Sequence, residues 1–240
     1  MPHLYRFIVL VTLALIPLVA QAAPETPTAT AKDLVAALEQ GYATIGDLQA
    51  TFAQRTTIAS LNREERGAGE VFIRKAGGAA MFRFNYSKPR QQIISNGKTV
   101  WYYLPENRQV IVSNVATLFA GGNGVALNYL TGLGHLSADF TAHLADKGRD
   151  SKGNYVLDLV PKKATPVMAR LRLTIASSAI ADYLEAKKAR EPFPILSSAV
   201  YDQLGNITRI DFSNVKVNRG LGSDRFTFKP PAGMEIIRNK

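Results

Sequence analysis

Alternating apolar and polar positions run through most of the chain and predict a fold built from β-strands. Phe82, Phe84 and Tyr86, for example, alternate with polar residues, so that one face of an extended chain is aromatic and the other polar. Segments of this kind, bounded by Gly, Pro or Asn, occupy residues 48–53, 71–74, 81–86, 91–94, 99–104, 109–113, 155–161, 169–176, 200–201 and 207–217. Their regular spacing and short turns predict an antiparallel meander.

Polar stretches mark where neighbouring strands are expected to turn. Asn96-Gly97 is typical of a two-residue hairpin turn, and the polar residues 56–67 are expected to form the end of another hairpin. Phe226 and Phe228 end the strand pattern near the C-terminus.

Three segments lack the strand pattern. Thr30 and Asp33 form a T-x-x-D capping pattern, which predicts a helix that continues to Tyr42. Residues 178–191, SAIADYLEAKKARE, are expected to form a separate amphipathic helix. Within residues 116–140, short apolar pieces are interrupted by glycines, which indicates short helices that pack loosely and can move.

The apolar face of such a large sheet needs a partner, and two arrangements can supply it. The sheet can curl around a core made of its own side chains. Alternatively, the glycine-rich residues 116–140 can cover its mouth and leave a cavity between. Periodicity alone favours the filled core, because barrels of modest size usually fill themselves, and leaves the cavity as the alternative.

The N-terminal residues have the features of an export signal. Arg6 gives a positive start, residues 7–19 are almost wholly apolar, and Ala20-Gln21-Ala22 supplies the small-x-small cleavage pattern. An uncleaved membrane anchor needs about 20 apolar residues, whereas about thirteen are present. We therefore expect a signal peptide over residues 1–22, and a single mature domain over residues 23–240 that is exported and soluble.

The composition narrows the classes of chemistry and partner. Because the chain has no Cys, it has no disulfide, no thiolate catalysis, no Cys-based metal site and no lipid-modified cysteine. Its net charge of +10 suits anionic lipid head groups or an acidic partner, and general solubility explains the charge equally well. Export and the lack of a dense basic block argue against nucleic acid.

The sequence contains no recognisable catalytic pattern. His135 and His143 have no carboxylate spaced to complete a metal site, and no Gly-x-Ser-x-Gly occurs. Glu64-Glu65 lie between arginines in an expected loop, which indicates a solvated charge cluster. We therefore expect no enzymatic activity and no bound metal or cofactor.

Six segments, taken in order, carry a wider similarity. They are LQATFAQ (48–54), GAGEVFIRK (67–75), FRFNY (82–86), IISNGKTVWYYLP (93–105), VYDQLGNITRIDFSNVKVN (200–218) and FTFKPPAGMEII (226–237). Together they resemble the periplasmic outer-membrane lipoprotein carrier family, LolA, from Leu34 to Ile237. Each motif alone is weak, but their order and spacing are specific.

The resemblance implies a mainly β fold: a strongly curved, incomplete antiparallel β-barrel (half-barrel) covered by a lid of short helices over an apolar cavity. It also implies an activity, the carriage of triacylated lipoproteins through the periplasm by a monomer that binds their acyl chains. The implied partners are the inner-membrane lipoprotein-releasing ABC transporter and the outer-membrane acceptor LolB or an equivalent. LolB shares the fold but is itself a lipoprotein, and the lack of Cys argues against that identity.

The apolar residues of the strands and of the glycine-rich segment are the ones expected to line the lipid-binding cavity. They are Phe52, Phe72, Phe82, Phe84, Trp101, Leu104, Leu118, Phe119, Leu127 and Leu130. Plain core packing is the alternative role for each of them. Because strand alternation puts Trp101 and Leu104 on opposite faces, both cannot belong to one cavity.

The expected lid consists of residues 30–42 and 116–140. In the family, an arginine followed by a proline, near the end of the strand that corresponds to residues 71–75, contacts the lid backbone. Here Lys75 falls at the matching position, Arg74 precedes it, and no proline follows. Arg74 and Lys75 are therefore the expected lid or gate residues.

Two other functions fit the same sequence less well. A lipid-sensing regulator, or a periplasmic lipid-binding protein of the same fold without transfer activity, is the main alternative. Such regulators carry an additional C-terminal domain, whereas this sequence is expected to end after its PPAG motif. A secreted β-rich enzyme is disfavoured by the missing catalytic patterns.

Overall fold

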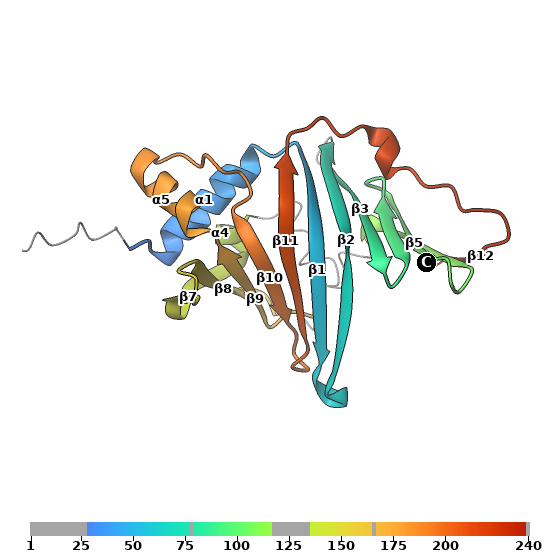
Figure 1. Ribbon diagram of the computed structural model, residues 1–240, viewed down its shortest axis with the longest axis horizontal. Coiled ribbons are helices and arrows are strands. Elements are labelled where there is room, and N and C mark those ends of the chain that lie inside the picture. Colours follow the sequence, from blue (N-terminus) through green and yellow to red (C-terminus); the bar gives the residue numbers. More distant parts are fainter. Residues whose placement is uncertain (1–27, 77–78, 117–134, 165–166, 239–240) are drawn as a thin grey trace, which may run out of the picture.

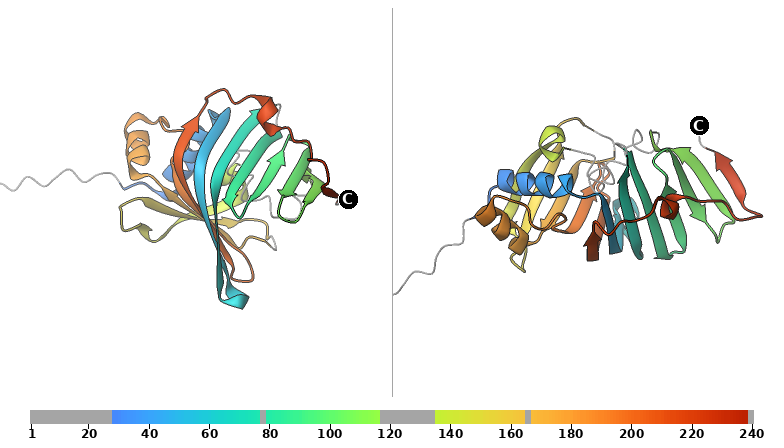
Figure 2. Two further views of the ribbon diagram at one scale, coloured as in Figure 1. Left: turned by 45° about the vertical axis from the view of Figure 1, so that its right-hand side comes forward. Right: turned by 90° about the horizontal axis from the view of Figure 1, so that it is seen from above.

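The computed structural model describes residues 28–76, 79–116, 135–164 and 167–238, and strands predominate in this part of the chain. The described strands form a single 12-stranded sheet that is open and strongly curved (Figure 1, Figure 2). In chain order they are β1 (Asp47–Ile58), β2 (Arg63–Ala76), β3 (Ala79–Lys88), β4 (Gln91–Ser95), β5 (Thr99–Leu104), β6 (Gln109–Asn114), β7 (Phe140–Arg149), β8 (Tyr155–Pro161), β9 (Arg170–Ile175), β10 (Ile195–Tyr201), β11 (Ile207–Val217) and β12 (Glu235–Arg238).

The strand order places two antiparallel meanders side by side. It reads β12-β6-β5-β4-β3-β2-β1-β11-β10-β9-β8-β7, so β1 to β6 form one meander and β7 to β11 the other. β1 pairs with β11 and joins the two. The expected half-barrel of antiparallel strands is confirmed, and β12 is the exception because it runs parallel to β6.

The described helices confirm the predicted helices over residues 30–42 and 178–191, and one short helix lies within residues 116–140. They are α1 (Ala31–Ala43), α4 (Leu136–Asp139) and α5 (Ser177–Ala186), with the single 3-10 turns η1 (Ala59–Leu61) and η2 (Ser223–Phe226). At the start of α1, the Asp33 N–H donates to Thr30 Oγ1 at 3.2 Å, and the Thr30 N–H donates to Asp33 Oδ2 at 2.9 Å. α5 ends earlier than expected, because Lys187 adopts a left-handed conformation with φ 52°.

The inner face of the sheet, which is the face that α1 covers, holds the main hydrophobic core. Leu34 and Leu38 of α1 pack in one cluster with Phe52, Phe82 and Phe84 of the sheet. Burial of each of these phenylalanines stabilises the fold by about 1.5–3 kcal/mol. α1 also contacts β7, α4 and α5, so the described helices gather over the half of the sheet that β7 borders (Figure 2).

The outer face of β2 to β6 has an apolar layer of its own, beneath the C-terminal segment, residues 219–238. Phe226 of η2 and Phe72 of β2 are both buried and do not belong to the main core. Arg83 Nη1 donates a hydrogen bond to the Arg225 carbonyl at 3.2 Å, and the Arg225 guanidinium lies 4.5 Å from the centre of the Phe72 ring. The apolar surface of this sheet is therefore covered on two sides.

Several element boundaries differ from the predictions. The predicted hairpin end at residues 56–67 is wrong in extent, because β1 and β2 remain paired up to Ile58 and Arg63 and only a short turn separates them. Residues 56–67 are polar because the arm that β1 and β2 form projects beyond the neighbouring strands, where its side chains are half-buried or exposed (Figure 1). β7 and β12 were not predicted, β10 begins five residues earlier, at Ile195, and Phe226 belongs to η2 instead of a strand.

Candidate functional site

Apolar side chains continue along the inner face beyond the main core. In the antiparallel register Phe84 lies opposite Ile93, Ile93 opposite Tyr102, and Tyr102 opposite Ile111. Opposed residues share a face, so this row crosses β3, β4, β5 and β6 on the inner side. By the same alternation Leu104 belongs to the inner face as well. We call Ile93, Tyr102, Leu104 and Ile111 the apolar extension.

The apolar extension is less covered than the main core. All four of its side chains are half-buried, whereas Phe84 beside them is 7% exposed. Of the four, Ile93 packs against the main core, and the other three lie outside that cluster. A row of half-buried apolar groups that leads out of a core is a surface on which an apolar ligand can be covered.

The structure brings together part of the predicted cavity lining. The centroid of the Phe84 ring lies 5.7 Å from that of Phe52 and 6.2 Å from that of Phe82, and both pairs pack edge to face. These three phenylalanines are core residues at the inner end of the apolar extension, and Leu104 belongs to the extension itself. Leu118, Phe119, Leu127 and Leu130 lie outside the described residues, as do residues 117–134 of the predicted lid.

Phe72 and Trp101 do not face the concave side, and their prediction as cavity lining is wrong. Phe72 lies opposite Arg83, and Trp101 opposite Ile94, which places both on the outer face. The Trp101 ring packs against Phe228 of the C-terminal segment, with 6.2 Å between centroids. Their aromatic surface is covered there by a segment more than 120 residues away in sequence, which alternation within β5 does not reveal.

Two tyrosines carry polar groups into this apolar surface, and each has a partner. The Tyr86 hydroxyl donates to Gln54 Oε1 at 2.8 Å, and the Tyr102 hydroxyl donates to Gln91 Oε1 at 2.7 Å. Burial raises the pKa of Tyr86 to about 12 and also raises the pKa of Tyr102. Both phenols therefore stay neutral at physiological pH, and no charge develops on the inner face at these positions.

Lys75 fastens α1 to the sheet. Its Nζ donates a hydrogen bond to the Tyr42 carbonyl, in the last turn of α1, at 2.6 Å. Its backbone N–H donates to the Gly46 carbonyl at 2.9 Å. Burial lowers the pKa of the Lys75 ammonium, which is half-buried. Arg74 precedes it in β2 and points to the other face, so Lys75 is the residue that contacts the helix over the core.

Replacing Lys75 with methionine is expected to loosen α1. The Tyr42 carbonyl loses a charged donor but keeps the N–H of Ile45, and removal of a half-buried charge offsets part of the loss. We expect amide hydrogen exchange of α1 to accelerate by about tenfold, which corresponds to about 1.4 kcal/mol. Arg74→Met is the matched control, since it removes a neighbouring cation from the other face. Equal acceleration in both variants would contradict the contact.

The described residues contain neither a candidate metal site nor a candidate membrane-spanning helix. No group of three or more His, Asp or Glu side chains suited to a metal ion occurs among them. His143 lies opposite Asp158 on the outer face, and Arg172 binds that carboxylate with two hydrogen bonds of 2.6 Å. In the described part of the chain, no helix has both the length and the apolar character to span a membrane.

Two sequence comparisons identify the same family. The family described as "Outer membrane lipoprotein carrier protein LolA" matches residues 43–229. The chain is similar to the outer-membrane lipoprotein carrier protein of Methylococcus capsulatus, with 29% identity over 194 residues, which cover 80% of this chain and 82% of that protein. It is also similar to the outer-membrane lipoprotein carrier protein of Legionella pneumophila (strain Corby), with 28% identity over 197 residues, 81% of this chain and 84% of that protein.

The chain also matches solved structures, at low sequence identity. A LolA superfamily protein from Nitrosomonas europaea matches with 16% sequence identity and a TM-score of 0.40, covering 84% of this chain and 99% of that one. The family match begins in the last residue of α1 and runs through β1 to β11 and η2, so it includes all four strands that carry Phe84 and the apolar extension.

Proposed function

This chain belongs to the LolA family of outer membrane lipoprotein carrier proteins, and from that membership we propose that it carries lipoproteins by holding their acyl chains against the apolar extension. The family match over residues 43–229 is the observation that carries the proposal. The cargo is a lipoprotein, and the compartment in which the family works is the periplasm.

The physical need for a carrier follows from the hydrophobic effect. At about 0.8 kcal/mol for each buried methylene, three long acyl chains left in water cost on the order of tens of kcal/mol. A lipoprotein therefore crosses an aqueous space only when another molecule covers these chains. The apolar extension is suited to this task because its side chains are half-buried in the protein and carry no ionised group.

The phenylalanines of the main core support the apolar extension and do not themselves need to touch cargo. Phe52, Phe82 and Phe84 hold the inner end of the row in place through edge-to-face contacts. Acyl chains that lie on Tyr102, Leu104 and Ile111 replace contact with water by contact with an existing apolar surface. Of the expected gate residues Arg74 and Lys75, Lys75 holds α1, part of the expected lid, over the main core.

The partners and the route follow from the same proposal. An inner-membrane ABC transporter releases the lipoprotein to the protein, and LolB or an equivalent outer-membrane acceptor takes it over as a tighter binder. Residues 1–22 direct export and are removed, and residues 23–240 act as one domain. The sequence has no nucleotide-binding motif, so the free energy for loading comes from the transporter.

A release assay tests the proposal. Spheroplasts that synthesise a labelled outer-membrane lipoprotein are incubated with the purified mature protein, and lipoprotein in the soluble fraction is measured. We expect release in a soluble one-to-one complex, with the bound acyl chains detected by native mass spectrometry. An unrelated periplasmic protein of similar charge is the control. Bound lipid without lipoprotein release would overturn the carrier role and favour a lipid-binding protein of the same fold.

A further inference from the structure

Two leucines at one end of the molecule are exposed to solvent. Leu61 of η1, at the tip of the arm that β1 and β2 form, is 61% exposed, and Leu204 in the turn between β10 and β11 is 80% exposed. Both turns lie at the lower end of the sheet, beyond the ends of the other labelled strands (Figure 1). The core gains nothing from side chains in these positions, because neither leucine contacts it.

The two turns are joined and held in fixed conformations. The Ala59 N–H, in η1, donates to Asn206 Oδ1 at 2.9 Å, which ties the arm to the neighbouring turn. The Asp202 carboxylate accepts hydrogen bonds from the N–H groups of Leu204 and Asn206, each at 2.8 Å. These hydrogen bonds fix the two turns that carry the leucines. We call Leu61 and Leu204 together the apolar tip.

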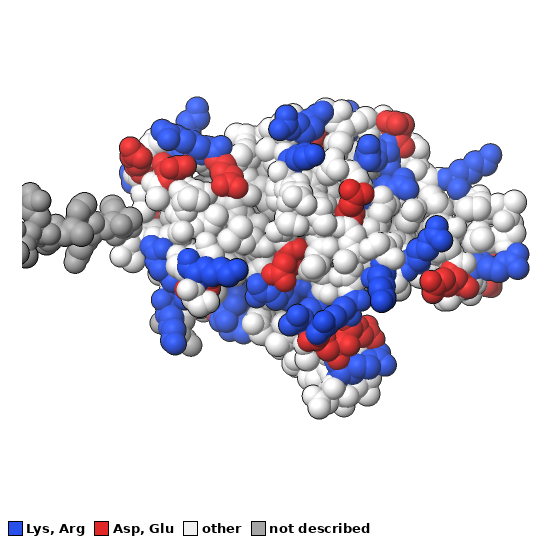
Figure 3. Space-filling view, in the orientation of Figure 1, with Lys and Arg blue, Asp and Glu red and all other residues white. Residues whose placement is uncertain are grey.

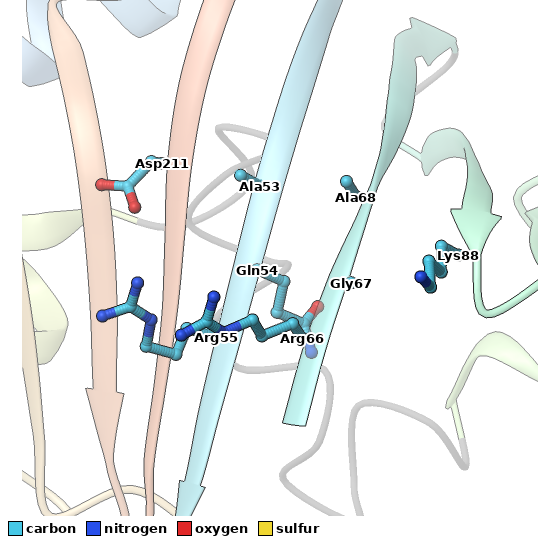
Figure 4. Close-up of a pocket in the computed structure, with 8 residues that line it drawn as sticks. All are labelled: Ala53, Gln54, Arg55, Arg66, Gly67, Ala68, Lys88 and Asp211. Carbon is cyan, nitrogen blue, oxygen red and sulfur yellow. The ribbon is translucent and has the colours of Figure 1, made fainter. Parts of the chain in front are cut away.

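Basic side chains lie directly behind the apolar tip. A groove of about 460 Å³ crosses the outer face where β1 and β2 leave the sheet. Its floor is formed by Ala53, Gly67 and Ala68, while Arg55 and Arg66 extend along it and Lys88 and Asp211 stand at opposite sides (Figure 4). In the space-filling view the tip is uncharged, and Lys and Arg gather just above it, around a few acidic side chains (Figure 3).

The acidic residues of this region neutralise only part of its positive charge. The Glu64 carboxylate forms ion pairs with both Arg55 Nε, at 3.4 Å, and Arg66 Nε, at 2.7 Å. Asp211 is held by Arg209 at 2.8 Å. The Lys88 ammonium makes no hydrogen bond or ion pair with the described residues, so it is available to an anion outside the chain.

We propose that this end of the protein contacts an anionic lipid bilayer, with Leu61 and Leu204 inserted at the head-group level and Arg55, Arg66 and Lys88 beside lipid phosphates. Interfacial binding grows with the apolar area buried and with the attraction of basic residues to anionic lipids, and this end supplies both. A convex tip with two aliphatic side chains enters a deformable lipid surface readily. It offers far less than the area of about 800 Å² that each partner contributes to a stable protein interface.

This contact goes beyond the carriage of acyl chains. A carrier can receive and deliver cargo through protein partners alone, without touching a membrane itself. A bilayer contact at the apolar tip brings the open sheet to the surface that cargo leaves or enters. The tip and groove are separate from the apolar extension, so the protein can contact the bilayer with or without bound cargo.

Vesicle flotation with the cargo-free mature protein tests the inference. Vesicles of phosphatidylethanolamine and phosphatidylglycerol are compared with vesicles of phosphatidylcholine alone. We expect the protein to float with the anionic vesicles and to stay behind with the zwitterionic ones. The double variant Leu61→Ser/Leu204→Ser is expected to bind the anionic vesicles about tenfold more weakly. Both leucines are exposed, so an unchanged melting temperature verifies the fold of the variant.

Leu196→Ser is the matched control. Leu196 is 39% exposed and lies near the start of β10, at the other end of the strand that leads to Leu204. Its replacement is expected to leave flotation unchanged. Equal flotation of the wild type and the double variant would mean that overall charge alone attracts the protein, and would overturn the inference.

Two further outcomes would also overturn it. If the wild type does not float with anionic vesicles, the tip has no membrane role. If the wild type is a dimer that the double variant loses, the apolar tip is an interface between two copies of the chain. Lipoprotein release in the spheroplast assay by a protein that does not float would remove this inference and leave the carrier role intact.

Discussion

Replacing Ile111 with glutamate is expected to weaken acyl-chain binding by about a hundredfold while the protein stays folded. Ile111 is half-buried on the inner face, so in the empty protein a carboxylate at this position can remain hydrated. An acyl chain that covers the position has to remove that water, and a carboxylate without a partner is costly to desolvate. Displacement of a fluorescent fatty acid measures the affinity, and thermal unfolding verifies the fold.

Val112→Glu is the matched control for this variant. Val112 follows Ile111 in β6 and is also half-buried, but it lies opposite Trp101 on the outer face. The two variants add the same charge to the same strand and differ in the face that receives it. We expect the Val112 variant to keep wild-type affinity. An equal loss in both variants, or in neither, would show that acyl chains do not lie on the apolar extension.

The choice of Ile111 over a core phenylalanine is deliberate. Phe84 is 7% exposed and touches the rings of Phe52 and Phe82, so a charge there disrupts the fold as well as any cargo surface. Loss of binding in such a variant would have two explanations. A charge at Ile111, at the half-buried end of the same row of side chains, distinguishes loss of the cargo surface from loss of the fold.

Short-range patterns in the sequence predicted the elements that depend on neighbouring residues. β8 and β11 have the bounds that alternation indicates, and α1 begins at the capping pattern of Thr30 and Asp33. The hairpin at Asn96-Gly97 also forms, although residues 96–98 separate its strands instead of two residues, and the Thr99 N–H donates to Asn96 Oδ1 at 2.8 Å. In each case the stabilising contacts lie within a few residues of the pattern that signals them.

The missed elements depend on contacts that are remote in sequence. β12 has four residues, and it forms because β6, more than 120 positions earlier, offers an edge for parallel pairing. β7 is interrupted by an irregularity between Leu144 and Arg149, which breaks the alternation that would have revealed it. No local pattern contains this information.

The same limit explains the mixed result for the candidate site. Alternation in β5 correctly separates Trp101 from Leu104, but it does not say which of the two faces is concave. The register across β3, β4 and β5 decides this, because it aligns Tyr102 with Ile93 and Phe84. The choice between Arg74 and Lys75 has the same basis: Lys75 shares a face with Ile73, and the structure shows that Ile73 belongs to the main core.

Truncation of Phe226 tests how the C-terminal segment is held on the outer face of the sheet. Phe226→Ala is expected to lower the free energy of unfolding by about 3 kcal/mol and to detach this segment from the outer face. Phe226 is fully buried there, and the hydrogen bond of Arg83 to the Arg225 carbonyl also links η2 to β3. Detachment also removes Phe228 from Trp101. Because Trp101 is the single tryptophan of the chain, its emission in the folded variant is expected to shift to longer wavelength.

Phe193→Ala distinguishes detachment from general destabilisation. Phe193 is also buried, but it packs in the main core against Tyr42 and Phe212, with ring centroids 6.0 Å and 5.4 Å away. We expect a comparable loss of stability in chemical denaturation, because the same side chain is truncated in a packed environment. The native emission of Trp101 should not change, since Phe193 lies on the other face. If Phe226→Ala also leaves the emission unchanged, the C-terminal segment is held by its other contacts, and β12 alone is enough to anchor it.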